Sequence, residues 1–152
     1  MNGILINGVV WATRNIGNAC EFVDKPEECG ALYVGNEAHL VCPKGWHLPT
    51  EEEFNSLLDA SDLGYKMGWG GLNGAPGYKI IDRNGNTVLF LPAAGYWDYQ
   101  TNKFCGSGNV GCYWGRSVYE QLQCNLVFDR STSRISYGPP ALGALLRCVA
   151  DK

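Results

Sequence analysis

The sequence predicts one α+β domain, in which small antiparallel sheets surround a single main helix. The chain of 152 residues contains 20 glycines and five tryptophans, and this composition favours a turn-rich, β-containing fold with large aromatic anchors. An Asn7-Gly8 pair between apolar runs favours a tight hairpin. One segment, beginning at Thr50, has the start signals of a helix. The length is that of one domain with its own core.

The composition also limits the classes of function. The chain is 45% hydrophobic and 18% charged, with a net charge of −3, so it has no basic footprint for phosphate and we expect no nucleic-acid partner. No apolar run approaches the roughly 20 residues that span a bilayer, so we expect no membrane span. The start, MNGILINGVVWATRN, has no basic, apolar and cleavage regions of a signal peptide. Seven cysteines without a CxxC pair leave the redox compartment open.

Apolar runs and turn residues predict the strands in chain order. The first hairpin is expected over 4–12, a loop over 15–30 and a short strand over 32–34. Residues 64–77 contain six glycines with Trp69 and Pro76, and we expect an irregular loop there. A second hairpin joins 78–81 to 87–91 across Asn84-Gly85. Loop-rich sequence then surrounds further short strands, expected at 113–114, 125–128, 134–137 and 145–149.

The segment HLPTEEEFNSLLDA predicts a helix over about 50–60. Thr50 stands at the N-cap and Glu53 follows three residues later, which is the spacing of a capping box. Three glutamates in the first turn suit the positive end of the helix dipole. The apolar residues that follow form one face, which we expect in the core: Phe54, Leu57 and Leu58.

Histidine and cysteine side chains could supply zinc ligands, but their spacing argues against a metal site. The candidates are His39, Cys42 and His47, with Cys29 upstream, and they match no common finger or ribbon. We therefore predict no metal and interpret these residues as structural.

Catalytic motifs are also absent from the sequence. Both histidines lie in the first third of the chain, and there is no GxSxG elbow, no Cys/His signature and no GK[ST] after a glycine-rich loop. We therefore predict no catalytic residue and no cofactor.

The C-terminal third has the composition of a recognition surface. Tyrosines, arginines and other aromatic residues alternate there with Ser, Gly and Asn between Trp97 and Leu146. Rigid aromatic side chains give contact area at low entropy cost, and Ser, Gly and Asn give adaptable hydrogen bonds. Because Trp114 lies in a predicted strand, we expect it in the core; the loop positions of Arg116, Tyr119 and Tyr137 predict exposure.

Several motifs carry a family resemblance. They are VVWATRNIG near the N-terminus, CPKGWHLPTEEEF at 42–54, FLPAAGY at 90–96, and then GCYWGRS, CNLVF and ALLRCVAD. In this order they resemble the Fibrobacter succinogenes major paralogous domain, which is common in Bacteroidetes proteins and similar in fold to C-type lectins and formylglycine-generating enzymes. The resemblance covers nearly the whole chain, so it implies a single C-type-lectin-like domain over 1–152 with small twisted antiparallel sheets and a loop-rich C-terminal β half.

The departures from that family suggest a second resemblance. Where such domains usually have YWSSS this chain has YWGRS, and where they close with RANGFSVRCV it has PALGALLRCV. Framework residues are kept while the residues between them are replaced. This pattern resembles that of the variable proteins of diversity-generating retroelements, whose C-terminal segment is rewritten at template adenines. The resemblance implies an invariant framework over 1–96 and a variable ligand-binding segment over 97–146.

Rewritten asparagine codons yield many residue types but not Lys, Glu, Gln, Met or Trp. The resemblance therefore implies fixed residues at Trp97, Lys103, Trp114, Glu120, Gln121 and Gln123. The resemblance also implies that unpaired Cys112 and Cys124 are chance products of this codon rewriting. The predicted ligand-binding residues are Tyr99, Phe104, Cys105, Ser107, Cys112, Gly115, Arg116, Val118, Tyr119, Leu122, Cys124, Asp129, Tyr137, Pro139 and Leu142.

The resemblance has further implications for covalent structure, partners and location. In the lectin-like arrangement the chain ends meet, so Cys42 and Cys148 are the expected disulfide pair. The implied partner is a protein or cell-surface ligand, and the implied setting is a phage particle or a bacterial surface. The EPN, QPD and WND motifs of calcium-dependent lectins are absent, and Cys148 in LLRCV does not reproduce the formylglycine-generating context. An invariant adhesin domain and a formylglycine-generating type of enzyme remain the alternatives.

Overall fold

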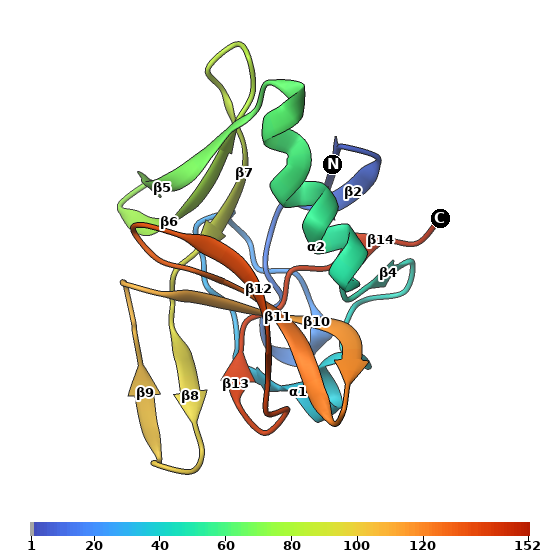
Figure 1. The fold of residues 1–152 in the computed structure, drawn as a ribbon, viewed down its shortest axis with the longest axis vertical. Helices are drawn as coiled ribbons and strands as arrows, with labels where there is room; N and C mark the ends of the chain where they lie inside the picture. Colours follow the sequence, from blue (N-terminus) through green and yellow to red (C-terminus); the bar gives the residue numbers. More distant parts are fainter. Residues whose placement is uncertain (1) are drawn as a thin grey trace.

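Four small antiparallel sheets and one main helix make up the part of the chain described by this computed structural model, residues 2–152 (Figure 1). The predicted α+β class is confirmed, since all ten pairings between the strands of this region are antiparallel and helices are few. Sheets this small cannot bury a core alone, so each one packs against its neighbours or the helix.

One sheet joins the two ends of the chain. Its strand order is β1 (Gly3–Ile6), β2 (Val9–Ala12), β14 (Val149–Ala150) and β4 (Trp46–His47). The predicted Asn-Gly hairpin is confirmed, because Asn7 and Gly8 have φ of 47° and 84°, as a two-residue turn of type I′ requires. Both chain ends therefore lie in the same region, away from the lower end of the molecule in Figure 1.

The sheet of β5 (Lys66–Leu72), β6 (Ala75–Ile81) and β7 (Thr87–Pro92) corrects one prediction and confirms another. The loop expected over 64–77 is wrong, because most of that segment forms β5, a two-residue turn and the start of β6. Gly77 shows why glycine occurs inside a strand here: a Cβ would lie 2.3 Å from the Leu91 carbonyl oxygen. The predicted hairpin between β6 and β7 is confirmed.

Two further sheets contain the C-terminal third. One consists of β10 (Gly111–Tyr119), β11 (Leu122–Phe128) and β12 (Ser133–Gly138), so three predicted short strands exist as parts of longer ones. The other has the order β3 (Tyr33–Val34), β13 (Gly143–Ala144), β8 (Tyr96–Asp98) and β9 (Lys103–Cys105).

The continuous strand expected over 145–149 is wrong. Strand pairing is interrupted between β13 and β14, because the chain crosses here from one sheet to another. Buried Arg147 lies in this crossing and donates to the Phe90 carbonyl at 2.7 Å, the Ala12 carbonyl at 3.2 Å and Asn15 Oδ1 at 2.7 Å. Burial lowers the pKa of Arg147 to about 10, because the guanidinium has lost its water.

The helix predicted at Thr50 is confirmed as α2 (Glu51–Leu58), and the 3-10 turn η2 (Asp59–Leu63) continues it. Both capping-box bonds are present: the Glu53 N–H donates to Thr50 Oγ1 at 3.1 Å, and the Thr50 N–H donates to Glu53 Oε1 at 2.9 Å. Phe54 and Leu57 are buried as expected, whereas Leu58 is only partly buried. Shorter helical turns are α1 (Gly35–Ala38) and η1 (Asn18–Cys20).

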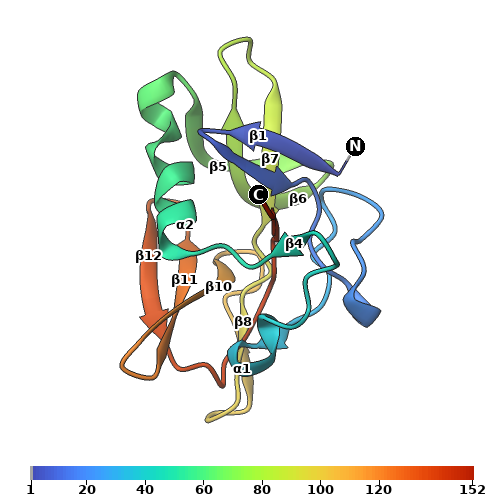
Figure 2. The same cartoon turned by 90° about the vertical axis from the view of Figure 1, so that its right-hand side faces the viewer.

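The core lies between α2 and the sheets, as the second view shows (Figure 2). Trp11 and Trp114 are the largest fully buried side chains, so the prediction that Trp114 belongs to the core is confirmed. The Trp114 indole N–H donates to the Tyr33 carbonyl at 3.0 Å, which ties β10 to β3. Within residues 2–152, no helix is long and apolar enough to cross a membrane.

Candidate functional site

Two hairpins of the C-terminal third point toward the same end of the molecule. The turn between β8 and β9 and the turn between β10 and β11 both lie at the lower end in Figures 1 and 2. Exposed apolar side chains accompany both turns, and we call this set the hairpin end: Tyr99, Phe104, Val118, Tyr119 and Leu122. Sequence reasoning named all five, and the structure brings them to one end of the fold.

The β8–β9 hairpin carries an aromatic cluster. Trp97 lies between Tyr99 and Phe104, with ring centroids 6.0 and 6.2 Å away, and both contacts are edge-on. Gly143 on β13 permits the close approach of this hairpin, because a Cβ there would lie 3.2 Å from Trp97 Cβ. Trp97 therefore contacts both exposed rings, and these contacts restrict the rotation of the two side chains before any ligand binds.

The β10–β11 hairpin holds the other half of the hairpin end on a rigid base. Glu120 and Gln121 form its tight turn with φ of 48° and 69°. Val118 and Tyr119 are 66% and 65% exposed, although the same strand has Trp114 in the core. The strand leaves the core at a bulge after Trp114, and this bulge redirects the side chains that follow it.

A short loop joins β12 to β13. It contains two predicted residues, exposed Pro139 and half-buried Leu142, and the Leu142 N–H donates to the Pro139 carbonyl at 3.1 Å. The Gly35 N–H donates to the Pro140 carbonyl at 2.6 Å, which fixes the loop to α1.

Three predicted contact residues are corrected to core residues. Cys112 is 5% exposed and Cys124 is 0% exposed, because both point inward from their strands. Gly115 is buried, and a Cβ there would meet Cys124 Sγ at 2.4 Å and Phe54 Cε2 at 2.6 Å. These positions cannot touch a ligand, and we interpret them as residues chosen by packing.

Four other predicted residues lie outside the hairpin end. Ser107 follows β9, half-buried Cys105 ends it, and exposed Asp129 follows β11 at the end opposite the β10–β11 turn. Backbone N–H groups of the following turn donate to Asp129 and lower its pKa. Tyr137 is half-buried on β12 and donates its hydroxyl to Glu51 Oε1 at 2.6 Å.

Sequence reasoning missed a shallow depression beside the hairpin end. It measures about 360 Å³ and lies where α1 contacts β10. Two lining residues were predicted contacts, Arg116 and Val118, and four were not: Gly35, Asn36, His39 and Gln123. Gly35, Asn36 and His39 belong to the segment interpreted as framework, and Gln123 was expected to be a fixed residue within the variable segment. Only the fold could place α1 beside β10.

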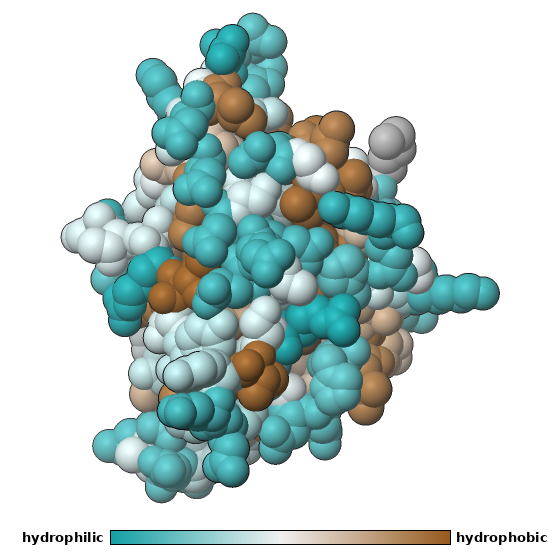
Figure 3. Space-filling view, turned by 45° about the vertical axis from the view of Figure 1, so that its right-hand side comes forward, coloured by the Kyte–Doolittle hydropathy of each residue, from teal (hydrophilic) through white to brown (hydrophobic). Residues whose placement is uncertain are grey.

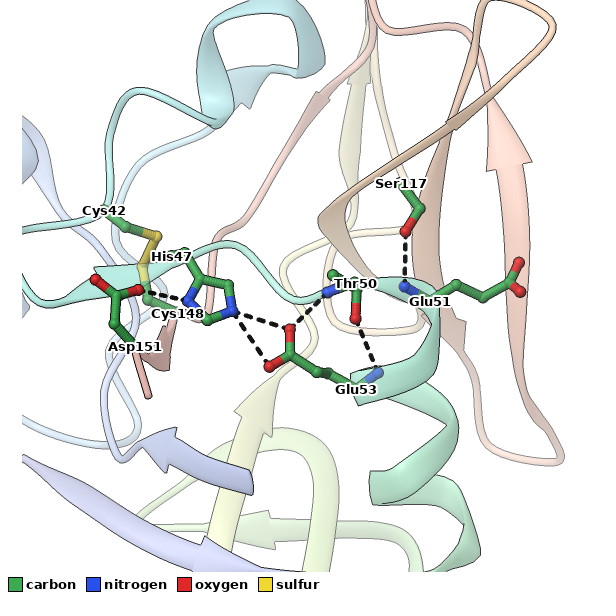
Figure 4. A network of polar contacts seen from close by, with 8 residues as sticks. All are labelled: Cys42, His47, Thr50, Glu51, Glu53, Ser117, Cys148 and Asp151. Carbon is green, nitrogen blue, oxygen red and sulfur yellow. Dashed lines mark hydrogen bonds and ion pairs between the residues drawn. A yellow bond between two sulfur atoms is a disulfide. The ribbon is translucent and has the colours of Figure 1, made fainter. Parts of the chain in front are cut away.

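A polar network ties the start of α2 to the C-terminus (Figure 4). The His47 ring bonds Asp151 Oδ1 through Nδ1 at 2.6 Å and Glu53 Oε1 through Nε2 at 3.0 Å. Within the described residues, His47 has no hydroxyl or thiol partner, so this arrangement lacks the nucleophile of a catalytic triad. Its geometry fixes the helix start against the sheet that joins the chain ends.

The disulfide expected from the resemblance is present. Cys42 and Cys148 are bonded, with Cα atoms 6.1 Å apart, next to the His47 network (Figure 4). Burial raises the pKa of the Cys112 thiol to about 12 and also raises the pKa of Cys29 and Cys124. Thiols with raised pKa values stay protonated at neutral pH, which is typical of structural cysteines.

The face drawn in Figure 3 is mostly hydrophilic, and its strongly hydrophobic side chains lie in small separate patches. Among the described residues, no group of three or more His, Cys, Asp or Glu side chains could hold a metal ion.

Comparisons of the chain with family models, with curated proteins and with solved structures gave no significant match.

Proposed function

We propose that this protein recognises a macromolecular ligand, a protein or another cell-surface component, through the hairpin end. One observation carries the proposal. Eight large apolar side chains are exposed among the described residues, and five of them are the hairpin end. Exposed apolar groups gathered in one region of a surface are characteristic of interaction sites.

The way these side chains are held supports recognition without chemistry. Tyr99 and Phe104 rest on Trp97, and Tyr119 extends from a strand anchored by buried Trp114. Pre-organised aromatic residues lose little entropy on binding, which is the property of effective paratopes. No catalytic step is proposed, because the buried thiols are not activated and His47 contacts only carboxylates among the described residues.

We also infer that the domain is C-type-lectin-like and that a retroelement diversifies its hairpin end. The meeting of the chain ends in one sheet, with the Cys42–Cys148 disulfide, supports the fold. The five residues of the hairpin end are types that adenine rewriting yields. Of the residues expected to be fixed, Trp114 and Gln123 are buried, whereas Lys103, Glu120 and Gln121 are exposed. Sequencing of the neighbouring DNA tests whether a retroelement diversifies the domain. We expect a near-copy of the 3′ coding end that differs mainly at adenines and lies beside a reverse transcriptase gene. An intact locus without such a copy would favour an invariant adhesin domain.

Binding itself is tested by presenting the immobilised domain with a glycan array and with a displayed library of random peptides. We expect binders whose retention is lost when Val118 and Tyr119 are both changed to Asp. Leu63→Asp is the matched control, because Leu63 is 46% exposed but lies outside the hairpin end, and it should retain the same binders. Binders that ignore the hairpin change, or no binders to a folded domain, would contradict the proposed function.

A further inference from the structure

The depression beside the hairpin end is lined by hydrogen-bond donors. Arg116 contributes a guanidinium, His39 an imidazole and Asn36 a side-chain amide. The Gln123 amide nitrogen already donates to the Gly115 carbonyl at 2.8 Å, which fixes that side chain as part of the wall. Arg116, His39 and Asn36 make no side-chain hydrogen bond to any residue from 2 to 152, so their donors are free.

The Arg116 guanidinium forms no ion pair within the described residues. Within residues 2–152, both ion pairs involve His47, and no carboxylate lies within 4.0 Å of the Arg116 guanidinium. Arg116 also borders a second depression whose lining includes Glu52, Glu53 and Asp151, but Glu53 and Asp151 are engaged by His47. Exposed Glu37 lies on α1 and is not part of the lining.

The backbone of Arg116 is held in place by the fold. Its backbone N–H donates to the Pro49 carbonyl at 2.8 Å, which holds β10 against the start of α2. The guanidinium thus leaves a fixed backbone at the border of the depression. A planar donor fork of this kind recognises a carboxylate in two parallel hydrogen bonds.

We propose that this depression binds the carboxylate of an acidic side chain on a polypeptide ligand. The inference deepens the proposed function, on which it rests, by naming the chemistry of the ligand. Arg116 supplies the charged fork, and Asn36 and His39 supply further donors. A ligand residue of opposite charge also explains why the protein leaves this arginine unpaired.

The neighbours of the depression favour a polypeptide over an anionic polysaccharide. Val118 forms part of its wall and pairs across the hairpin with Gln123, which also lines it. This apolar wall beside the arginine suits an acidic side chain that has an apolar neighbour in a peptide segment. An anionic polysaccharide has repeated charges, whereas this depression offers one arginine.

The test uses the intact domain and a displayed library of short random peptides. We expect the selected peptides to be enriched in Asp or Glu next to apolar residues. For one such peptide, changing its acid to the amide and changing Arg116→Gln should each weaken binding about tenfold or more, as loss of a charge-assisted pair does. The two changes together should cost little more than either alone, since they remove the same contact.

Arg134→Gln is the matched control. Arg134 is an exposed arginine of the variable segment on β12 that does not line the depression, so this variant should keep wild-type affinity. Unchanged thermal melting of Arg116→Gln is expected, because the backbone bond to Pro49 does not need the side chain.

The outcomes separate this inference from the proposed function. Peptides that bind through Val118 and Tyr119 without acid preference, or that ignore Arg116→Gln, would overturn the carboxylate site and leave hairpin recognition intact. Heparin retained through Arg116, with no peptide selected, would overturn it in favour of a polysaccharide. Binding of any probe that does not depend on the hairpin end would instead refute the proposed function.

Discussion

Gly115 shows how one residue can be required by packing although its surroundings suggested a binding position. It lies on β10 between buried Trp114 and exposed Arg116, and its missing side chain leaves room for Cys124, Phe54 and the Pro49 carbonyl. Cys124 fits the same explanation, since it is a small buried thiol at the same contact. Side-chain volume, rather than ligand contact, therefore accounts for these two positions.

Gly115→Ala should destabilise the domain by about 1–3 kcal/mol, the usual cost of inserting a methyl group into a filled core. Gly68→Ala is the control, because a Cβ at Gly68 in β5 would meet no atom within 4 Å. It should change the free energy of unfolding by no more than about 0.5 kcal/mol. Urea denaturation of the two variants measures the difference, and equal stabilities would contradict the packing explanation.

Tyr137 is held by a single charged acceptor. The hydrogen bond from its hydroxyl to Glu51, together with burial and the negative charge of Glu51, raises its pKa from 10.0 to about 12. A pKa that is higher in the folded state means that this bond contributes stability below pH 10. The contribution is lost as the pH rises from 10 to about 12, because the ionised phenolate faces a carboxylate.

Tyr137→Phe should therefore remove one late-ionising phenol from the tyrosinate absorbance titration. The difference curve between wild type and variant should show its midpoint near pH 12, and the stability advantage of the wild type should shrink between pH 10 and 12. A difference curve centred near pH 10 would mean that the hydrogen bond to Glu51 does not form in solution.

At the scale of elements, α2 is the part that the sequence predicted best. Its signals are local: an N-cap threonine, a glutamate three residues later, and an apolar face.

Thr50→Ala should destabilise the domain by about 1 kcal/mol, the usual contribution of an N-cap. Thr101→Ala, in the exposed β8–β9 turn, is the control. Denaturant melting that gives both variants wild-type stability would show that the cap does not contribute.

The elements that the sequence did not predict are those whose structure depends on distant partners. Residues 64–77 looked like a loop because of their glycines, but cross-strand contacts such as Gly77 against Leu91 require glycine within the sheet. The strand expected over 145–149 is interrupted because the chain changes sheets around Arg147. Turn pairs such as Asn7-Gly8 were predictable, since their backbone preference is local.

The candidate site was likewise only partly predictable from the sequence. The exposure predicted for Arg116 and Tyr119 from a loop position is confirmed although both lie on β10, whereas Tyr137 on β12 is half-buried. Burial of Cys112 depended on which face of β10 points inward. Neither Asn36 nor His39 could be assigned to the site from the sequence, because only tertiary contact places α1 beside β10. Residue types thus indicated a recognition surface, and the fold determined its members.

At the scale of the whole molecule, the Cys42–Cys148 disulfide and the sheet that joins the chain ends close the fold. The bridge spans 106 residues, so it strongly restricts the unfolded chain. Its reduction should lower the free energy of unfolding by about 2–5 kcal/mol. Thermal melting with and without reductant measures this. A variant with both cysteines changed to Ser should melt like the reduced protein and ignore reductant, whereas Cys20→Ser, at an exposed free thiol, should behave as wild type.

We propose that a closed framework carries a separate recognition surface. The most direct test is Tyr119→Ala, for which affinity toward a library-selected peptide and the free energy of unfolding are measured under the same conditions. Because Tyr119 is 65% exposed on the hairpin end, affinity should fall by roughly 1–4 kcal/mol, as at a hot spot, while stability stays within about 0.5 kcal/mol. A variant that binds the peptide as tightly as wild type, or that loses several kcal/mol of stability, would contradict the claim.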